Sequence, residues 1–126
     1  IKYSKEEVAE QEALFEFQKK WYLDLYSFKD EKDLSAYLSD KEVILDAGCG
    51  LGYKAKWFAE LSPESCVIGM DYSDSSFVAA NRYQDTKNLF FVNKFSSSKA
   101  IERRFKSALQ FEKNSTLVLW RGSIAG

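Results

Sequence analysis

The chain has 126 residues, a formal net charge of −1 and no histidine, which suits a single globular domain. Without histidine, a Ser-His-Asp triad, a Cys-His pair and a His-ligated metal site are excluded, and we expect no metal. The balanced charge provides no basic field for nucleic acid, and no apolar stretch approaches the roughly 20 residues of a membrane span. The two cysteines lack C-x-x-C spacing, which favours a reducing compartment. We therefore expect a cytoplasmic protein that binds neither membrane nor nucleic acid.

Residues 1–40 predict a helical cap. Ser4 and Glu7 form a capping-box pattern at the start of a helix over residues 4–26. Apolar residues then recur at approximately helical spacing: Val8, Leu14, Phe15, Phe17, Trp21 and Leu25. Aromatic side chains at such spacing usually pack, so we expect them to cover the edge of a sheet. A second short helix is predicted for Glu31 to Leu38.

The stretch V-I-L-D-A-G-C-G-L-G, from Val43 to Gly52, predicts a strand, a glycine turn and then a helix over 53–61. The apolar β-branched run that opens it is typical of a buried parallel strand, which Asp46 ends. Glycines at alternate positions let a ligand lie against the backbone, and the helix that follows would point free N–H groups at it. A tight turn without a ligand is the alternative.

A second and a third unit follow. Residues 66–70 predict another strand, Asp71 follows it, and a helix with Ser73 or Asp74 as its N-cap runs to about residue 83. Its apolar residues available for packing are Phe77, Val78 and Ala80. Residues 88–92 predict a third strand. An acid after the second strand can accept hydrogen bonds from both ribose hydroxyls, and units of this spacing predict a parallel sheet.

The D-x-G-x-G-x-G turn and Asp71 together resemble the class I S-adenosylmethionine-dependent methyltransferases. A dinucleotide fingerprint would need a third glycine at the position of Tyr53, which makes an NAD-dependent oxidoreductase a weaker alternative. The resemblance implies an α/β fold: a Rossmann-like three-layer α/β/α sandwich with a mainly parallel sheet. Residues 1–126 would form one domain, with a helical N-terminal cap over 1–40 and the Rossmann-like core over 41–126.

The resemblance also implies S-adenosyl-L-methionine as cofactor and S-adenosylhomocysteine as product. Asp46 would orient the ammonium of the methionine part, the glycines would let the backbone approach it, Asp71 would hold the ribose and Tyr72 would flank the adenine. Asn93 stands where the family usually has an acid near the adenine amino group. An F-x-x-x-W-like pattern beside the pocket would correspond to Phe17 and Trp21. The implied cofactor-binding residues are Asp46, Gly48, Cys49, Gly50, Gly52, Asp71, Tyr72 and Asn93.

The sequence leaves two questions open: the role of Cys49 and the identity of any catalytic residue. Cys49 is either a reactive thiol at a helix N-terminus or a small residue that packs. No catalytic residue is identified; Asp85 and Glu102 are the available carboxylates, and each fits a solvated face better. Since the sulfonium is an activated donor, proximity and orientation can supply much of the rate.

The last part of the chain departs from the family pattern. The usual fourth strand and the C-terminal strands are not found; instead, residues 101–111 predict a helix and residues 116–120 a last strand. That strand can pair with the first one, which gives the order 3-2-1-4 and leaves a hydrophobic edge where a homodimer could form. The predicted function is methyl transfer to an unidentified acceptor. The alternative is a non-catalytic or truncated S-adenosylmethionine-binding module or dimerisation domain.

Overall fold

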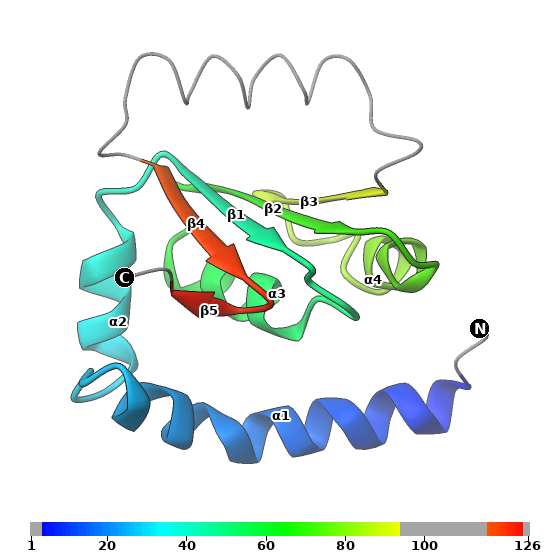
Figure 1. The fold of residues 1–126 in the computed structure, drawn as a ribbon, viewed down its shortest axis with the longest axis horizontal. Coiled ribbons are helices and arrows are strands. Elements are labelled where there is room, and N and C mark those ends of the chain that lie inside the picture. Colours follow the sequence, from blue (N-terminus) through cyan, green and yellow to red (C-terminus); the bar gives the residue numbers. More distant parts are fainter. Residues whose placement is uncertain (1–3, 94–115, 125–126) are drawn as a thin grey trace.

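The computed structural model describes residues 4–93 and 116–124, which form a sheet covered by helices (Figure 1). The elements are α1 (Lys5–Leu25), α2 (Glu31–Leu38), β1 (Val43–Ala47), α3 (Tyr53–Leu61), β2 (Cys66–Asp71), α4 (Ser75–Arg82), β3 (Leu89–Asn93), β4 (Thr116–Trp120) and β5 (Ser123–Ile124). Every helix and strand predicted within these residues is confirmed, with ends shifted by one or two positions. The predicted helix 101–111 lies outside the described residues.

The strands form one sheet in the order β3-β2-β1-β4-β5. β1 pairs in parallel with both β2 and β4, and β2 pairs in parallel with β3, so the predicted order 3-2-1-4 is confirmed. The short β5 was not predicted; it runs antiparallel to β4 and pairs with Leu119 and Trp120. The fold is Rossmann-like α/β. β5 covers part of the edge through which the sequence predicts a homodimer, and the homodimer stays a prediction.

The described helices pack on one face of the sheet. The main core joins strand residues such as Ile44 and Leu119 to residues of α1, α2 and α3, among them Tyr22, Leu38 and Phe58. The opposite face carries a second buried cluster, which is built from strand residues alone: Val43, Leu45, Ile68 and Val92, with Cys66 and Met70 against it. The described residues therefore form two of the three predicted layers, and the remaining layer stays a prediction.

Helix α1 begins as predicted but turns a different face to the core. The Ser4 hydroxyl caps it by accepting a hydrogen bond from the Glu7 N–H at 3.1 Å. Phe15 packs against the core, whereas Phe17 is 84% and Trp21 is 68% exposed. The expectation that Phe17 and Trp21 cover the sheet or flank the pocket is therefore wrong. Residues two positions apart on a helix point about 200° apart, so Phe15 and Phe17 cannot share a face.

The buried face of α4 also differs from the expected one. Ser75, Ser76 and Ala79 are buried, while Phe77 and Ala80 are exposed. The reason is close packing on the glycine turn, because the Ala79 Cβ lies 3.2 Å from where a Cβ on Gly52 would be. Small side chains allow this approach, and larger ones are left for solvent.

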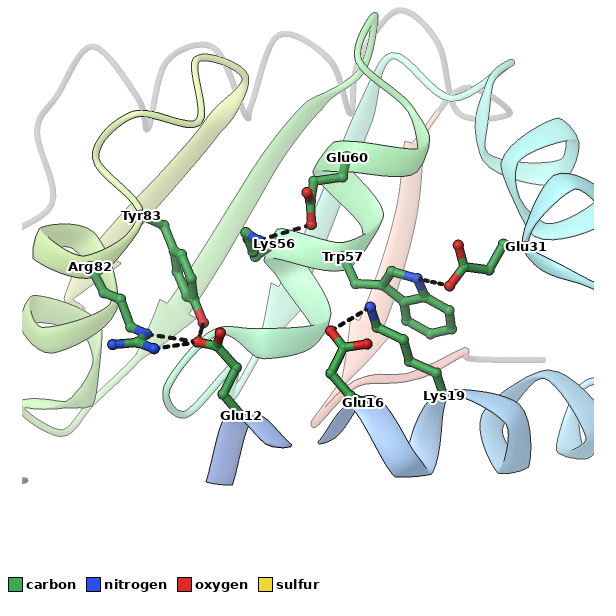
Figure 2. A network of polar contacts seen from close by, with 9 residues as sticks. All are labelled: Glu12, Glu16, Lys19, Glu31, Lys56, Trp57, Glu60, Arg82 and Tyr83. Carbon is green, nitrogen blue, oxygen red and sulfur yellow. Dashed lines mark hydrogen bonds and ion pairs between the residues drawn. The ribbon is translucent and has the colours of Figure 1, made fainter. Parts of the chain in front are cut away.

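Polar contacts fasten α1 across α3 and α4 (Figure 2). The Glu12 carboxylate accepts from the Arg82 Nη2 at 2.6 Å and from the Tyr83 hydroxyl at 3.2 Å. The Lys19 ammonium binds Glu16 at 2.8 Å and lies 5.5 Å from the centre of the Trp57 ring. These contacts hold α1 in a fixed position against α3 and the C-terminal end of α4.

Candidate functional site

The predicted site residues gather where β1, β2 and β4 end. From β1 the chain passes to β2 and β3 on one side of the sheet, and β4 then lies on the other side of β1. The strand order therefore reverses at the carboxyl end of β1, which makes this end a topological switch point. Ligands of open α/β sheets bind outside the carboxyl ends of the strands at such a point. The structure thus brings Asp46, the glycine turn and Asp71 to one edge of the sheet.

The glycine turn needs its glycines, since Gly48, Gly50 and Gly52 all have positive φ, at 77°, 57° and 81°. A Cβ on Gly52 would also lie 2.5 Å from the Phe91 ring, whereas a Cβ on Gly50 would meet nothing within 4 Å. The room for a ligand is therefore at Gly50.

The amides of the glycine turn itself form hydrogen bonds within the protein. The N–H groups of Gly48 and Cys49 both donate to the Met70 carbonyl, at 2.7 and 3.0 Å. The Gly52 N–H donates to the Cys49 carbonyl at 3.0 Å. The turn is therefore held against β2 by its own backbone, and these three amides do not point at a ligand.

Asp71 is the last residue of β2 and reaches into the same turn. Its Oδ2 accepts from the Gly50 N–H at 2.8 Å, and its Oδ1 accepts from the N–H and hydroxyl of Ser73 at 2.9 and 2.7 Å. Partial burial alone would raise the pKa of Asp71, but the hydrogen bonds from Ser73, Gly50 and Tyr72 hold it below its ordinary value. Asp71 is thus an ionised acceptor at neutral pH.

Two further predicted residues lie beside Asp71. Tyr72 follows it, and its side chain is 60% exposed. Asn93 ends β3 and is paired with Asp71 in the sheet register, but its amide nitrogen donates to the carbonyls of Tyr72 and Ser73, at 3.3 and 3.2 Å. Asn93 therefore holds the loop after β2 in place.

Asp46 occupies a different environment. It lies inside β1 instead of ending the strand, and it is 1% exposed. Its Oδ1 accepts a hydrogen bond from the Gly122 N–H at 2.9 Å. Burial raises the pKa of Asp46 to about 6, and the Gly122 amide and the charge of Lys54 act against that rise.

A cavity of about 150 Å³ opens beside Asp46. Its wall is made by residues of α1, the glycine turn, the start of α3 and the β4–β5 turn: Phe15, Asp46, Gly48, Cys49, Tyr53, Lys54, Arg121 and Gly122. Sequence reasoning missed Lys54, Arg121 and Gly122. Lys54 stands two residues after the last glycine of the motif, but Arg121 and Gly122 are far from it in the chain, and the pairing of β1 with β4 brings them there.

Cys49 behaves as a packed thiol. Its Sγ lies 3.0 Å from where a Cβ on Gly69 would be, so it fills the space over β2. Burial, with the nearby carboxylates of Asp46 and Asp71, raises the pKa of the Cys49 thiol well above its ordinary value. A reactive thiolate is not favoured here, and the packing alternative fits.

Neither a metal cluster nor a membrane-spanning helix is found in residues 4–93 and 116–124. Within these residues no group of three or more His, Cys, Asp or Glu side chains lies close enough to hold a metal ion. No helix in the same two segments has the length and apolar character that crossing a membrane requires.

Comparison with known proteins gives short matches. No family model matches the chain. An uncharacterised phycocyanin operon protein W of Pseudanabaena tenuis is 43% identical over 47 residues, which are 36% of this chain and 44% of that protein. Malonyl-[acyl-carrier protein] O-methyltransferase of Bacillus cereus is 35% identical over 48 residues, 38% of this chain and 18% of the enzyme. The enzyme of the same name from Bacillus anthracis is 33% identical over 48 residues.

The matches thus span under half of the first of these relatives and about a fifth of the enzymes. Among solved structures, YjhP from E. coli has a TM-score of 0.41 and 24% identity, covering 53% of this chain and 30% of that one. The chain is therefore similar to the two O-methyltransferases over about 48 residues, and its own strand order is Rossmann-like.

Proposed function

We propose that the chain binds S-adenosyl-L-methionine at the ends of β1 and β2 and transfers its methyl group to an acceptor that is not yet identified. The observation that carries the proposal is the hydrogen bond of 2.8 Å from the Gly50 N–H to the Asp71 carboxylate. It joins the glycine turn after β1 to the acid that ends β2, so one ligand can touch both. A nucleoside with a ribose diol matches that pairing.

The residues present fit such a ligand. The space beyond Gly50 is open, and the ionised Asp71 stands next to it. Among the donors to Asp71 in the described part of the chain, the Ser73 hydroxyl is the one carried by a side chain, so a ribose hydroxyl can take its place without moving the backbone. Tyr72 follows Asp71 in the chain, and its exposed ring offers a flat surface on which a base can stack.

Asp46 supports the other end of the ligand. Its carboxylate lines the cavity at the turn and can attract an ammonium group. When bound, the cofactor supplies a sulfonium methyl that is already activated for transfer. The task of the chain is then to hold that group in line with an acceptor and to exclude water, which needs no general base among the described residues.

Calorimetric titration with S-adenosylhomocysteine tests the proposal. We expect micromolar affinity, roughly −8 kcal/mol, and a loss of a few kcal/mol in Asp71→Ala, because a charged acceptor is removed. Asp85→Asn, which neutralises an exposed carboxylate away from the turn, is the matched control. A folded chain that binds no S-adenosylhomocysteine would contradict the proposal.

A second candidate is a binding module without catalysis. It is favoured by one observation, namely that the amides of Gly48, Cys49 and Gly52 are already bonded within the protein. Product formation from S-adenosylmethionine with a broad acceptor panel separates the two candidates. Binding without product across that panel would support the module.

A further inference from the structure

Two cationic side chains line the cavity beside Asp46. Lys54 comes from the first turn of α3, and Arg121 from the turn between β4 and β5. Within the described part of the chain neither forms an ion pair, in contrast to Lys19, Lys56 and Arg82, which all bind glutamates. The two side chains therefore bring positive charge to the cavity wall, with Lys54 half-buried and Arg121 exposed.

The ammonium of Lys54 is held in position. It lies 4.1 Å from the centre of the Tyr22 ring, a cation–π contact. Its stem packs on Gly122, where a Cβ would come within 2.8 Å of the Lys54 Cδ. Lys54 is half-buried, and burial lowers its pKa while the charge of Asp46 opposes that change. An ammonium fixed in this way is poised for a ligand.

Arg121 is the first residue of the two-residue turn between β4 and β5. Its φ is 51°, in the left-handed region that a residue with a side chain rarely adopts. Its N–H donates to the Ala47 carbonyl at 2.7 Å, and its Cγ lies 3.1 Å from where a Cβ on Gly48 would be. The guanidinium stem thus lies over the glycine turn. The positive φ values of Arg121 and Gly122 are those of a two-residue hairpin turn, so the pairing of β4 with β5 fixes where Arg121 lies.

The charges around the cavity do not balance. Against the two cations, the cavity wall contributes one carboxylate, that of Asp46, which is itself engaged by the Gly122 N–H. One positive charge is left over for a ligand, and a guanidinium next to an ammonium suits a carboxylate. The remaining wall includes the rings of Phe15 and Tyr53, which stack with their centres 5.9 Å apart and make that side of the cavity aromatic.

We propose that Lys54 and Arg121 together form a carboxylate-binding site in this cavity. The site takes either the carboxylate of the bound cofactor or that of an acidic acceptor, and the experiment below separates these sources. The inference rests on the proposed function for its choice of probes.

The test is calorimetry with three probes on the wild-type chain and on Lys54→Met and Arg121→Gln. The probes are S-adenosylhomocysteine, 5′-methylthioadenosine, which has the same nucleoside but no carboxylate, and glutarate, a small dicarboxylate. Glutarate is titrated both with and without saturating S-adenosylhomocysteine. Lys87→Gln, which removes an exposed cation remote from the cavity, is the control. Thermal unfolding checks that each variant folds.

If the cofactor supplies the carboxylate, each variant weakens S-adenosylhomocysteine binding about tenfold and leaves methylthioadenosine binding unchanged. If an acceptor supplies it, both nucleosides bind as before and glutarate binding is lost. The site is overturned if the variants change neither kind of binding, or if they weaken both nucleosides equally. A wild-type chain that binds neither nucleoside contradicts the proposed function instead; glutarate binding that depends on Arg121 would then still support the carboxylate site, and no glutarate binding would refute it.

Discussion

The site has two halves that hold a carboxylate in opposite ways. The closed half consists of Asp46, Lys54, Gly122 and Tyr22, and the open half consists of Gly50, Asp71 and Ser73. In the closed half, burial raises the pKa of Asp46 to about 6. In the open half, hydrogen bonds hold the pKa of Asp71 below its ordinary value even though partial burial opposes them.

The difference follows from how many donors surround each acid. Asp46 is buried, with one backbone amide on its Oδ1, and desolvation dominates. Asp71 is partly exposed and is surrounded by donors from its own loop and from the glycine turn. The open half therefore stabilises the negative charge of Asp71, whereas burial in the closed half destabilises the negative charge of Asp46. A carboxylate whose pKa is strongly shifted beside a cavity marks a candidate functional site.

Asp46→Asn should give the largest effect on stability. An acid with a raised folded pKa binds more protons folded than unfolded between about pH 4 and pH 6, so wild-type stability falls as pH rises through that window and stays lower above it. The shift of about two units corresponds to about 3 kcal/mol. The asparagine keeps an oxygen for the Gly122 N–H but cannot ionise. We expect the variant to be more stable than wild type at pH 7 by as much as about 3 kcal/mol, and to lack the fall.

Urea unfolding at pH 4 and pH 7 measures the stability of the variant relative to wild type and the fall in stability between the two pH values. Asp71→Asn is the comparison from the open half, and its sign is opposite. A depressed folded pKa gives stability that is present above the unfolded value and is lost as pH falls through the folded one. If Asp46→Asn keeps the wild-type fall between pH 4 and pH 6, Asp46 is not its source.

Alanine at Gly122 and at Gly50 compares the backbones of the two halves. Both glycines have positive φ, 79° and 57°, so each substitution costs about 1 kcal/mol in strain. At Gly122 the new methyl group also displaces Lys54 from the Tyr22 ring, which adds up to about 1 kcal/mol. At Gly50 it meets open space. We expect losses of about 2 and about 1 kcal/mol in urea unfolding, and equal losses would show that Lys54 contributes nothing there.

The open half could be predicted from the sequence because it is local. A glycine turn after one apolar run and an acid after the next meet whenever the two strands lie side by side in parallel, and β1 and β2 do. Element order and the pairing of β1 with β4 followed from the same strand pattern. The hydrogen bonds of the turn amides could not be predicted in this way, because the Met70 carbonyl that accepts from two of these amides lies on the neighbouring strand.

The closed half could not be predicted, because its parts are distant in the chain. The Tyr22 hydroxyl donates to the Gly122 carbonyl at 2.9 Å, and the Ile124 N–H donates to the Tyr26 hydroxyl at 3.2 Å. No local pattern marks these contacts. The aromatic residues of α1 misled for a related reason. They occupy more than one face of the helix, and the inward face also carries charged residues such as Glu12, whose partners belong to α4.

The smallest expected effects come from single hydroxyl groups, one in each half. Tyr22→Phe leaves the buried Gly122 carbonyl without its donor and should cost about 1 kcal/mol. Ser73→Ala removes a donor from the partly exposed Asp71 and should cost about 0.5 kcal/mol. Under the proposed function, Ser73→Ala also frees an oxygen of Asp71 for a ribose hydroxyl, so affinity for S-adenosylhomocysteine should hold or rise. A loss as large as that of Asp71→Ala would mean that the Ser73 hydroxyl itself binds the ligand and that Asp71 serves to position it.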